Sequence, residues 1–565
     1  MSVAAERIWL KSYPPGIPAD IDYQPFSSIV ELFEQSVAMY AARNAYCFMG
    51  KTMTYAELEA DSCKLAAYLQ SLGLEKGARI AIMMPNCFQY PLALFAILRA
   101  GYTVVNVNPL YTPRELEHQL KDSGAQAIFI LENFAATLQQ VIDKTSVKHV
   151  VVSALGDRLG LKGFIVNLVV RHVKKLVPAW SLPGHMPFNK ALAQGERCAF
   201  SKPALTLDDV AFLQYTGGTT GVSKGATLTH KNIVANILQS EAWYMPALKR
   251  IPAGEQVVKV TALPLYHIFA LTACCLLGLR IGAMNLLIAN PRDFAKFIHD
   301  LSNCPPHVFP AVNTLFNALM HHPDFDKVNW KKLILAVGGG MAVQESVAAQ
   351  WLERTGCTIC QGYGLSETSP IVTCNPTDTR EFSGAIGLPL SNTEVSIRDD
   401  EGKSMSIGER GEICIRGPQV MVGYWQRPEE TAQVMTEDGY FRTGDIGIMD
   451  ERGYIRIVDR KKDMILVSGF NVYPNEVEEV IAGHPGVLEV AAVGVPDEYS
   501  GEAVKVFVVR KNQSLTEEDL KTYCTQNLTG YKRPKFFEFR DELPKTNVGK
   551  ILRRVLREEA LKKTT

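Results

Sequence analysis

The sequence predicts an α/β protein with a large N-terminal domain hinged to a small α+β C-terminal domain. The large domain would hold two α/β subdomains with parallel sheets plus a small β-barrel. Three observations support this prediction. At 565 residues the chain is longer than one hydrophobic core usually supports. Apolar residues make up 47% and charged residues 21%, as in globular proteins. Apolar strands alternate with amphipathic helices, which is typical of parallel sheets covered on both faces.

The first α/β series begins near residue 78. Residues 78–84 are apolar and are followed by Pro85, which predicts a buried strand, and residues 89–100 have a helical pattern that stops at Gly101. Thr112 is a favoured N-cap residue and predicts a helix over 113–123. The other strands predicted in this series cover 103–107, 127–131 and 149–152.

A second series begins near Val210, and a β-rich region follows it from about 384 to 458. Residues 332–337 form an apolar strand that runs into three glycines, Gly338, Gly339 and Gly340. The β-rich region contains short strands and glycine turns, which predict the small β-barrel. Its strands are expected at 394–397, 411–416 and 453–458.

The longest apolar stretch, 268–290, is interrupted by Arg280. A buried helix followed by a buried strand explains it better than a membrane span.

A charged segment, 459–463, separates the β-rich region from about 100 further residues and has the composition of a linker or hinge. Helices and strands are mixed beyond it, which predicts the compact α+β domain. The expected helices cover 474–482 and 516–527, and the expected strands cover 487–495, 503–509 and 536–539.

Charge and cysteine content narrow the functional class and the location. Lys and Arg together number 59, as do Asp and Glu, so a globally basic nucleic-acid-binding protein is not expected. The twelve cysteines are scattered, and residues 1–13 lack the apolar core of a signal peptide. We therefore expect reduced thiols and a cytoplasmic location.

The segment 213–230 has the strongest chemical signal, because four glycines and several hydroxyl residues lie between a strand and a helix. Glycine backbone N–H groups can converge on an anion, and Lys224 would add a positive charge for a polyphosphate. The order Ser223, Lys224, Gly225 does not fit a Walker A loop. Residues 221–225 do match the GxSxG letters of a serine hydrolase, which stays open as a remote alternative.

Four further segments carry groups suited to nucleotide chemistry. Gly338–Gly340 would let backbone approach a base or ribose, and 362–367 offers an aromatic face beside Glu367. Asp445 lies at a turn where it could accept hydrogen bonds from ribose hydroxyls, and Lys550 lies on a loop supported by glycine. Taken singly, each segment is also compatible with an ordinary surface turn.

Five motifs follow one another in a fixed order: TGGTTGxSKG at 216–225, YGxSE at 363–367, RTGD at 442–445, DRxKD at 459–463 and PKTxxGK at 544–550. This order resembles the adenylate-forming superfamily of acyl-CoA synthetases, adenylation domains and luciferases. The resemblance extends from Thr54 to Lys550. Residues 438–445 and 337–343 are most similar to bacterial long-chain fatty acid–CoA ligases.

The resemblance implies roles for individual residues. Lys550, Glu367 and His267 would be catalytic, Thr216 and Glu367 would lie at the metal, Lys462 would be the hinge, and Gly469 would line the CoA channel. The ATP-binding residues would be Tyr215, Thr216, Gly217, Gly218, Thr219, Thr220, Gly221, Lys224, Gly338, Gly339, Gly340, Gly362, Tyr363, Gly364, Ser366, Asp445 and Arg460. The N-terminal ATP- and acyl-binding domain would then cover 1–461, and a mobile C-terminal domain would cover 462–565.

The implied reaction has two steps and uses ATP, Mg²⁺ and coenzyme A. A carboxylate would attack the α-phosphate of ATP to give acyl-AMP and pyrophosphate, with Lys550 and Mg²⁺ balancing the growing negative charge. The C-terminal domain would then pivot at Lys462, withdraw Lys550 and admit the CoA thiol.

The acid is expected to be a medium- to long-chain fatty acid. Amino-acid-activating relatives carry an Asp where this chain has His267, which argues against an amino acid. His267 could position the carboxylate, act as a gate or make only a structural contact. A ligase for an aryl or short-chain acid and an acyl-AMP ligase that loads a carrier protein remain alternatives.

Residues 161–178 form an amphipathic pattern when wound as a helix. Ile165 and Val173 lie on one face, and Arg171 and Lys174 on the other. All charges in the segment are positive, which is typical of a helix on anionic lipid. The segment predicts peripheral contact with the cytoplasmic face of the membrane, with a helix packed between domains as the alternative. No nucleic-acid partner is expected, and an oligomer stays open.

Overall fold

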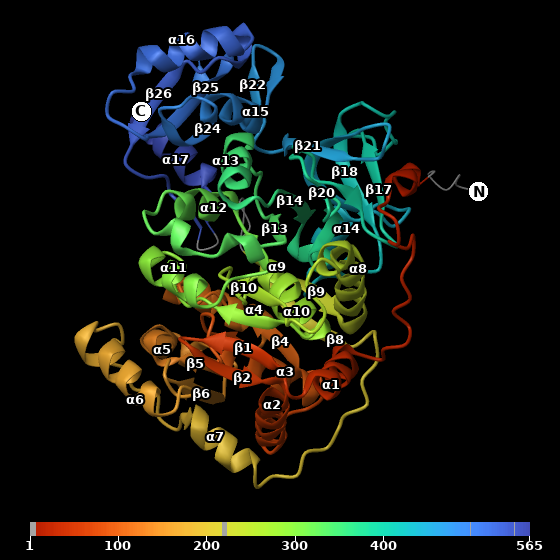
Figure 1. Cartoon of the computed structure of the whole chain (residues 1–565), viewed down its shortest axis with the longest axis vertical. Helices are drawn as coiled ribbons and strands as arrows, with labels where there is room; N and C mark the ends of the chain where they lie inside the picture. Colours follow the sequence, from red (N-terminus) through yellow and green to blue (C-terminus); the bar gives the residue numbers. More distant parts are fainter. Residues whose placement is uncertain (1–6, 217–222, 498, 547–548, 565) are drawn as a thin grey trace.

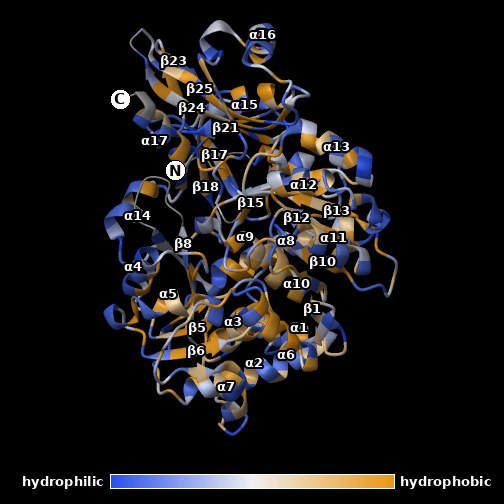
Figure 2. Ribbon diagram, turned by 90° about the vertical axis from the view of Figure 1, so that its left-hand side faces the viewer, coloured by the Kyte–Doolittle hydropathy of each residue, from blue (hydrophilic) through white to orange (hydrophobic). Residues whose placement is uncertain are grey.

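The computed structural model describes residues 7–216, 223–497, 499–546 and 549–564. Figure 1 shows two large sheets with their helices in the lower and central part of the view, a smaller antiparallel sheet above them, and the C-terminal region stacked on top. In Figure 2 the central strands and helix α3 (Gln89–Arg99) are hydrophobic, whereas helices at the edge, such as α4 (Pro113–Ser123), are hydrophilic.

The first sheet has eight strands, of which β3 to β8 pair in parallel, while β9 and β19 extend one edge antiparallel. It confirms the predicted strands at 78–84, 103–107, 127–131 and 149–152. In spatial order the strands are β19 (Gly423–Tyr424), β9 (Lys224–Thr229), β8 (Val210–Thr216), β4 (Thr103–Asn106), β3 (Arg79–Met83), β5 (Ala127–Leu131), β6 (His149–Ser153) and β7 (Met186–Pro187).

The second sheet has nine strands, with a parallel centre and antiparallel strands at both ends. In spatial order they are β16 (Leu388–Pro389), β15 (Ile371–Cys374), β14 (Ile359–Gly364), β13 (Leu335–Gly338), β12 (Val308–Ala311), β10 (Val258–Thr261), β11 (Met284–Leu287), β1 (Asn44–Phe48) and β2 (Lys51–Thr54). The two series are therefore interleaved. Strands β1 and β2 complete the second sheet, and β8, expected to open the second series, joins the first.

Local capping explains where several helices begin. Thr112 accepts a hydrogen bond from the Glu115 N–H at the start of α4, and the Glu115 carboxylate accepts from Thr112, as expected for a capping box. Thr54 caps α2 in the same way with Glu57. The remaining helices of the two sheets are α1 (Ile29–Tyr40), α2 (Tyr55–Gln70), α5 (Ala135–Gln139), α7 (Phe188–Gly195), α8 (His230–Leu248), α11 (Phe294–Asn303), α12 (Asn313–Met320) and α13 (Glu345–Thr355).

The apolar stretch 268–290 is a buried helix followed by a buried strand, as predicted. Helix α9 (Ile268–Ala270), a π-helical turn (Leu271–Leu276) and α10 (Leu277–Arg280) precede β11. None of the helices that the structure describes is both long and apolar enough to cross a bilayer.

The β-rich region forms an open antiparallel sheet. Its strands, in spatial order, are β17 (Glu394–Arg398), β18 (Gly411–Arg416), β20 (Phe441–Met449) and β21 (Ile455–Arg460). In the part of the chain that the structure describes, the end strands β17 and β21 do not pair with each other, so the predicted barrel closure is wrong. The short helix α14 (Pro428–Val434) lies near β19 and β20.

The C-terminal region is the predicted α+β unit, with a five-stranded sheet. Its long hairpin, β24 (Val487–Asp497) with β25 (Gly501–Arg510), is flanked by β22 (Ile465–Val467), β23 (Phe470–Val472) and the parallel strand β26 (Phe536–Arg540). The helices are α15 (Pro474–Ala482), α16 (Glu517–Asn527) and α17 (Arg553–Thr564).

The segment 459–463 is only partly a linker, which corrects the prediction. Asp459 and Arg460 are the last residues of β21, and only the following residues form a turn. Asp459 is fully buried and forms an ion pair of 3.2 Å with Arg553 of the C-terminal region. This ion pair and the pairing of β21 with β20 both hold Asp459 in place. The hinge at Lys462 and the limits 1–461 and 462–565 stay predictions.

The amphipathic segment is helical over a shorter range than predicted. Helix α6 (Leu161–Leu168) continues into a π-helical turn (Val169–Val173), and the helix ends there instead of at residue 178. Figure 1 shows α6 at the periphery of the molecule. Ile165 and Val173 are 63% and 68% exposed, so the alternative of a helix packed between domains is wrong for this face.

Candidate active site

The predicted site residues come from several elements that meet between the large sheets and the C-terminal region. Thr216 ends β8, Tyr363 lies on β14, Asp445 lies on β20, and Arg460 ends β21. Lys550 comes from the turn before α17. Chain topology therefore gathers motifs that are up to 334 residues apart in sequence.

Asp445 is the centre of one group. Its Oδ2 accepts a hydrogen bond of 2.6 Å from the Tyr363 hydroxyl, and its Oδ1 lies 3.6 Å from Nε of Arg460, its cross-strand neighbour. Burial raises the pKa of the Asp445 carboxyl, while Arg460 and the Tyr363 hydrogen bond oppose the rise. Asp445 and Arg460 are together, as the resemblance implied.

Glu367 lies in a short 3₁₀ turn (Ser366–Thr368) and is 8% exposed. Its Oε1 accepts a hydrogen bond of 2.8 Å from the hydroxyl of Tyr424, and burial raises its pKa. Sequence reasoning missed Tyr424. Only its place in a Gly-Tyr-Trp segment within the β-rich region set it apart, and that pattern carries no chemical signal.

Lys550 reaches this group from the C-terminal region. Its Cε lies 3.5 Å from the position that a Cβ on Gly340 would occupy. Burial, followed by the charge of Arg460, lowers the pKa of Lys550 to about 8, while Asp445 and Glu367 act in the opposite direction. Both carboxylates of the site therefore favour the charged form of this ammonium group.

His267 is uncharged in this arrangement. Its Nδ1 accepts a hydrogen bond of 3.3 Å from the Phe269 N–H, so the ring proton sits on Nε2. Burial and then Lys550 lower its pKa to about 3. A neutral imidazole can donate to a carboxylate oxygen, but the structure leaves the catalytic role of His267 a prediction.

The glycines predicted to contact ATP have different structural reasons to lack a side chain. A Cβ on Gly339 would lie 3.1 Å from the Phe269 ring, and one on Gly364 would lie 1.9 Å from the Pro370 carbonyl oxygen. Gly340 has φ +77°, which favours glycine. Gly338 would meet Val343 at 2.5 Å, whereas Gly362 would make only ordinary contacts. Close fit to the protein itself therefore explains most of them.

The glycine- and threonine-rich loop is only partly described. Gly217, Gly218, Thr219, Thr220 and Gly221 lie outside the described residues. At its edges, the Tyr215 hydroxyl donates to Asp122 at 2.7 Å, and Lys224 Nζ lies 5.2 Å from the centre of the Tyr424 ring. The structure thus connects Lys224 with Glu367 through Tyr424.

The hydrolase alternative lacks its required geometry. Strand β8 pairs antiparallel with β9, so the loop before Ser223 joins two strands and not a strand to a helix. The Ser223 hydroxyl donates to the Thr216 carbonyl at 2.6 Å, and its neighbour His118 contacts the Ser223 backbone oxygen.

Three predicted residues lie apart from these contacts. Lys462 is exposed in the turn after β21, and Gly469 lies in the exposed β22–β23 turn with φ +84° and no atom within 4 Å of its missing Cβ. Ser366 is half-buried beside Glu367. Their predicted roles in the hinge, the CoA channel and ATP binding stay predictions.

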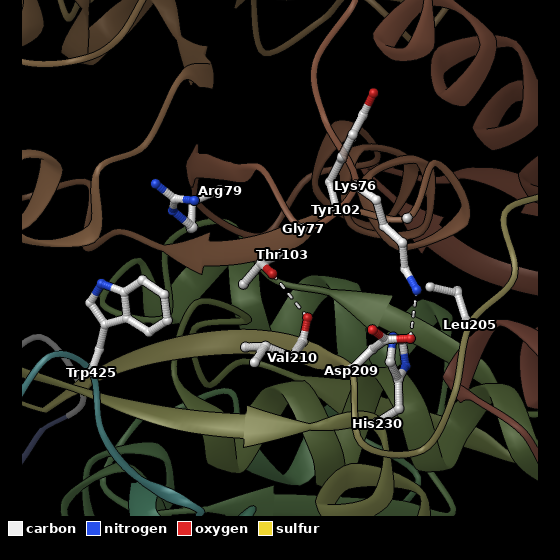
Figure 3. Close-up of a pocket in the computed structure, with 11 residues that line it drawn as sticks. Lys76, Gly77, Arg79, Tyr102, Thr103, Leu205, Asp209, Val210, His230 and Trp425 are labelled. Carbon is white, nitrogen blue, oxygen red and sulfur yellow. Dashed lines mark hydrogen bonds and ion pairs between the residues drawn. The ribbon is translucent and has the colours of Figure 1, made fainter. Parts of the chain in front are cut away.

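A separate cavity of about 200 Å³ lies at the amino edge of the first sheet, and Figure 3 shows its lining. Lys76 pairs there with Asp209 at 2.9 Å, so its charge is already balanced, and none of the predicted site residues lines the cavity.

Comparison with known proteins identifies the family. Residues 33–425 match the AMP-binding enzyme family, and residues 476–550 match the AMP-binding enzyme C-terminal domain. The chain belongs to the AMP-binding enzyme family. The resemblance inferred from the five ordered motifs is thereby confirmed.

Several members of this family are similar along nearly their whole length. The long-chain-fatty-acid–CoA ligase of Escherichia coli O157:H7 is 57% identical over 557 residues, 98% of each chain. The enzyme of the same name from Haemophilus influenzae is 51% identical over 560 residues, 99% of each chain. The crystal structure of the anthranilate CoA ligase AuaEII with anthranoyl-AMP superposes with a TM-score of 0.84 at 25% identity, covering 96% of this chain and 99% of that one. This AMP-binding enzyme therefore has the predicted adenylate-forming fold.

Proposed function

We propose that this AMP-binding enzyme converts a medium- to long-chain fatty acid to its CoA thioester in two steps. ATP and the fatty acid give acyl-AMP and pyrophosphate, and the CoA thiol then displaces AMP. The observation that carries the proposal is the meeting of Lys550 with Glu367, Asp445 and Arg460 around the glycines 338–340.

In the first step each of these side chains has a separate role. The Asp445 carboxylate can accept hydrogen bonds from ribose hydroxyls, and Arg460 and Tyr363 hold it in place. The Lys550 ammonium balances the negative charge that grows as the acid carboxylate attacks the α-phosphorus. The neutral His267 can donate its Nε2 proton to the acid carboxylate without adding charge.

The chemistry of Glu367 fits a magnesium ion that accompanies ATP. It is a buried carboxylate whose Oε1 is held by the Tyr424 hydroxyl. Hard carboxylate oxygens suit Mg²⁺, which usually keeps phosphate and water ligands as well. Among the described residues no group of three or more His, Cys, Asp and Glu side chains could hold a metal ion, so Glu367 and Thr216 would act together with the phosphates. When bound, Mg²⁺ supplies positive charge to the polyphosphate.

The second step needs a different arrangement. Lys550 occupies the space next to Gly340, so the CoA thiol and Lys550 cannot both approach the acyl carbonyl from there. Rotation about Lys462, which lies exposed in its turn, would withdraw Lys550 and bring Gly469 toward the thiol path. Gly469 lacks a side chain that could obstruct the channel.

The choice of acid rests on the relatives. Those with 51% to 57% identity are named long-chain-fatty-acid–CoA ligases, whereas the anthranilate ligase has 25% identity. The alternatives are a ligase for an aryl or short-chain acid and an acyl-AMP ligase that loads a carrier protein.

AMP formation by the purified protein tests this proposal. The assay supplies ATP, Mg²⁺ and saturated fatty acids of four to eighteen carbons, with and without CoA. CoA-dependent AMP release that is greatest with the longer acids supports the proposal. Turnover confined to short or aromatic acids would contradict the proposed fatty acid substrate. CoA-independent turnover with a carrier protein would mean that the carrier protein, and not CoA, accepts the acyl group.

We also propose a cytoplasmic protein that contacts the cytoplasmic face of the membrane through residues 161–178. The segment exposes six large apolar side chains, here called the α6 surface: Leu161, Phe164, Ile165, Leu168, Val173 and Leu176. Leu161 and Phe164 are 94% and 75% exposed. Lys174 and Lys175 are exposed beside them. An apolar surface next to positive charge suits an anionic lipid surface, where water-insoluble fatty acids gather.

A further inference from the structure

Tyr424 lies between two residues expected to act on ATP. Its hydroxyl donates a hydrogen bond of 2.8 Å to Oε1 of Glu367. The Lys224 ammonium lies 5.2 Å from the centre of its ring, within the range of a cation–π interaction. One side chain therefore contacts both the carboxylate expected at the metal and the lysine that follows the glycine- and threonine-rich loop.

The segment that carries Tyr424 holds Glu367 at two points. The Met421 N–H donates to the Glu367 backbone oxygen at 2.7 Å, and Tyr424 binds the carboxylate. The segment is fixed in turn, because the Tyr424 N–H donates to the Thr431 hydroxyl at 2.9 Å and a Cβ on Gly423 would lie 2.9 Å from Thr431 Cγ2. Strand β19 also pairs with β9, which begins at Lys224.

We propose that Tyr424 is a positioning residue of the adenylation site: its hydroxyl holds Oε1 of Glu367 so that the carboxylate stays oriented toward the divalent cation that accompanies ATP. Its ring contacts Lys224, which also lies 3.9 Å from the Glu430 carboxylate. This inference rests on the proposed use of ATP. Outer partners that orient a metal-binding carboxylate typically change metal affinity 10- to 100-fold when removed.

Tyr424→Phe tests the hydroxyl alone, because phenylalanine keeps the ring under Lys224. Binding of Mn²⁺, used as a paramagnetic probe, would be measured by electron paramagnetic resonance with the protein and a non-hydrolysable ATP analogue. We expect about 10-fold weaker Mn²⁺ binding in the variant. In steady-state assays KM for Mg²⁺ should rise, while kcat at saturating Mg²⁺ should change much less.

Tyr440→Phe provides a matched control. The Tyr440 hydroxyl donates to Glu394 Oε2, also at 2.8 Å, and the Arg416 guanidinium lies 4.7 Å from the Tyr440 ring centre. Glu394 is on β17 and has no proposed role in ATP binding. A merely structural effect of losing a tyrosine–glutamate hydrogen bond would lower the thermal stability of both variants and leave Mn²⁺ affinity unchanged in both.

A double variant sharpens the test. In the background of Glu367→Gln, Tyr424→Phe should cause no further loss of Mn²⁺ affinity, because its effect acts through the carboxylate. Mn²⁺ affinity in Tyr424→Phe within twofold of the wild type would overturn the inference, as would additive losses in the double variant. If the wild type itself does not bind Mn²⁺ with the ATP analogue, the proposed function fails first, so the two failures are distinguishable.

Discussion

Lys550 of the C-terminal region lies against Gly340 of the large domain, with its Cε 3.5 Å from the position of a Cβ on Gly340. The neighbouring residue is held as well, since the Thr314 hydroxyl donates to the Gly549 carbonyl at 3.1 Å. A further contact joins Asn317 Nδ2 to the Leu488 carbonyl at 3.4 Å. The C-terminal region therefore brings Lys550 to the part of the large domain that holds Glu367 and Asp445, which is the arrangement that the proposed adenylation step needs.

The pKa of Lys550 predicts how adenylation depends on pH. Because the pKa is lowered from its ordinary value near 10.5 to about 8, the ammonium form is lost as pH rises above about 8. We expect kcat/KM for acid-dependent ATP–pyrophosphate exchange to fall about tenfold per pH unit beyond that point. Lys550→Arg keeps its charge at high pH, so a decline of the same shape in this variant would exclude Lys550 as the cause.

Alanine substitutions at Gly549 and Gly469 are expected to affect different steps, the first adenylation and the second thioester formation. A Cβ on Gly549, where φ is +82°, would lie 2.7 Å from Thr314 Oγ1, so Gly549→Ala should displace the Lys550 turn and slow adenylation at least tenfold. Gly469→Ala introduces similar backbone strain, because φ is +84°, but it creates no steric clash, because no atom lies within 4 Å of the added Cβ. This variant should retain adenylation and slow only thioester formation.

Pyrophosphate exchange and release of CoA thioester from added acyl-AMP separate the two steps. Equal losses of both activities in both glycine variants would mean that strain alone, and not the proposed contacts, explains the effect.

Replacing the buried Lys259 by an apolar residue is expected to stabilise the folded protein. It is fully buried, its ammonium has no hydrogen-bond partner among the residues that the structure describes, and burial lowers its pKa from 10.5 to about 8. At pH 7 the buried charge costs about 3 kcal/mol. The unfolded chain binds more protons between about pH 8 and 10.5, so wild-type stability should rise with pH across that window. Lys259→Met should raise the unfolding free energy at pH 7 and flatten this rise.

Chemical unfolding at pH 7 and pH 9.5 measures both effects. Lys249→Met, at an exposed lysine, is the control and should change little. Lower stability of Lys259→Met at pH 7 would contradict the account, since it would mean that the contact of the ammonium with the Tyr244 ring outweighs desolvation.

The α6 surface predicts binding to anionic vesicles. Replacing Phe164 and Ile165 together by Asp removes two exposed apolar side chains and should weaken co-sedimentation with phosphatidylglycerol vesicles at least tenfold, without loss of activity on a water-soluble acid. Leu110→Asp, at a residue 62% exposed elsewhere on the molecule, should bind as the wild type does. Unchanged sedimentation of the double variant would exclude the α6 surface as the contact.

Local signals were sufficient to predict much of the fold. The capping residue Thr112, Gly101 after a helix, and the apolar run interrupted by Arg280 each act within a few residues, so the corresponding helices and strands are confirmed. The ordered motifs predicted the family because their residues are set by chemistry, and Asp445 with Arg460 lies where they implied.

Long-range pairing could not be predicted in the same way. Strand β1 belongs to the second sheet because it pairs with β11, which lies about 240 residues later in the sequence. Asp459 belongs to a charged run but is buried because Arg553 neutralises it from the C-terminal region. Tyr424 was missed because its importance depends on Glu367, 57 residues away, and not on its neighbours in sequence.

The central claim is that Lys550 completes the adenylation site from the C-terminal region. The most direct test is to measure both half-reactions in Lys550→Ala with the best fatty acid substrate. We expect a loss of about 10²- to 10³-fold in pyrophosphate exchange, with near wild-type conversion of added acyl-AMP and CoA to thioester. Full pyrophosphate exchange by the variant, or equal loss of both half-reactions, would contradict the central claim.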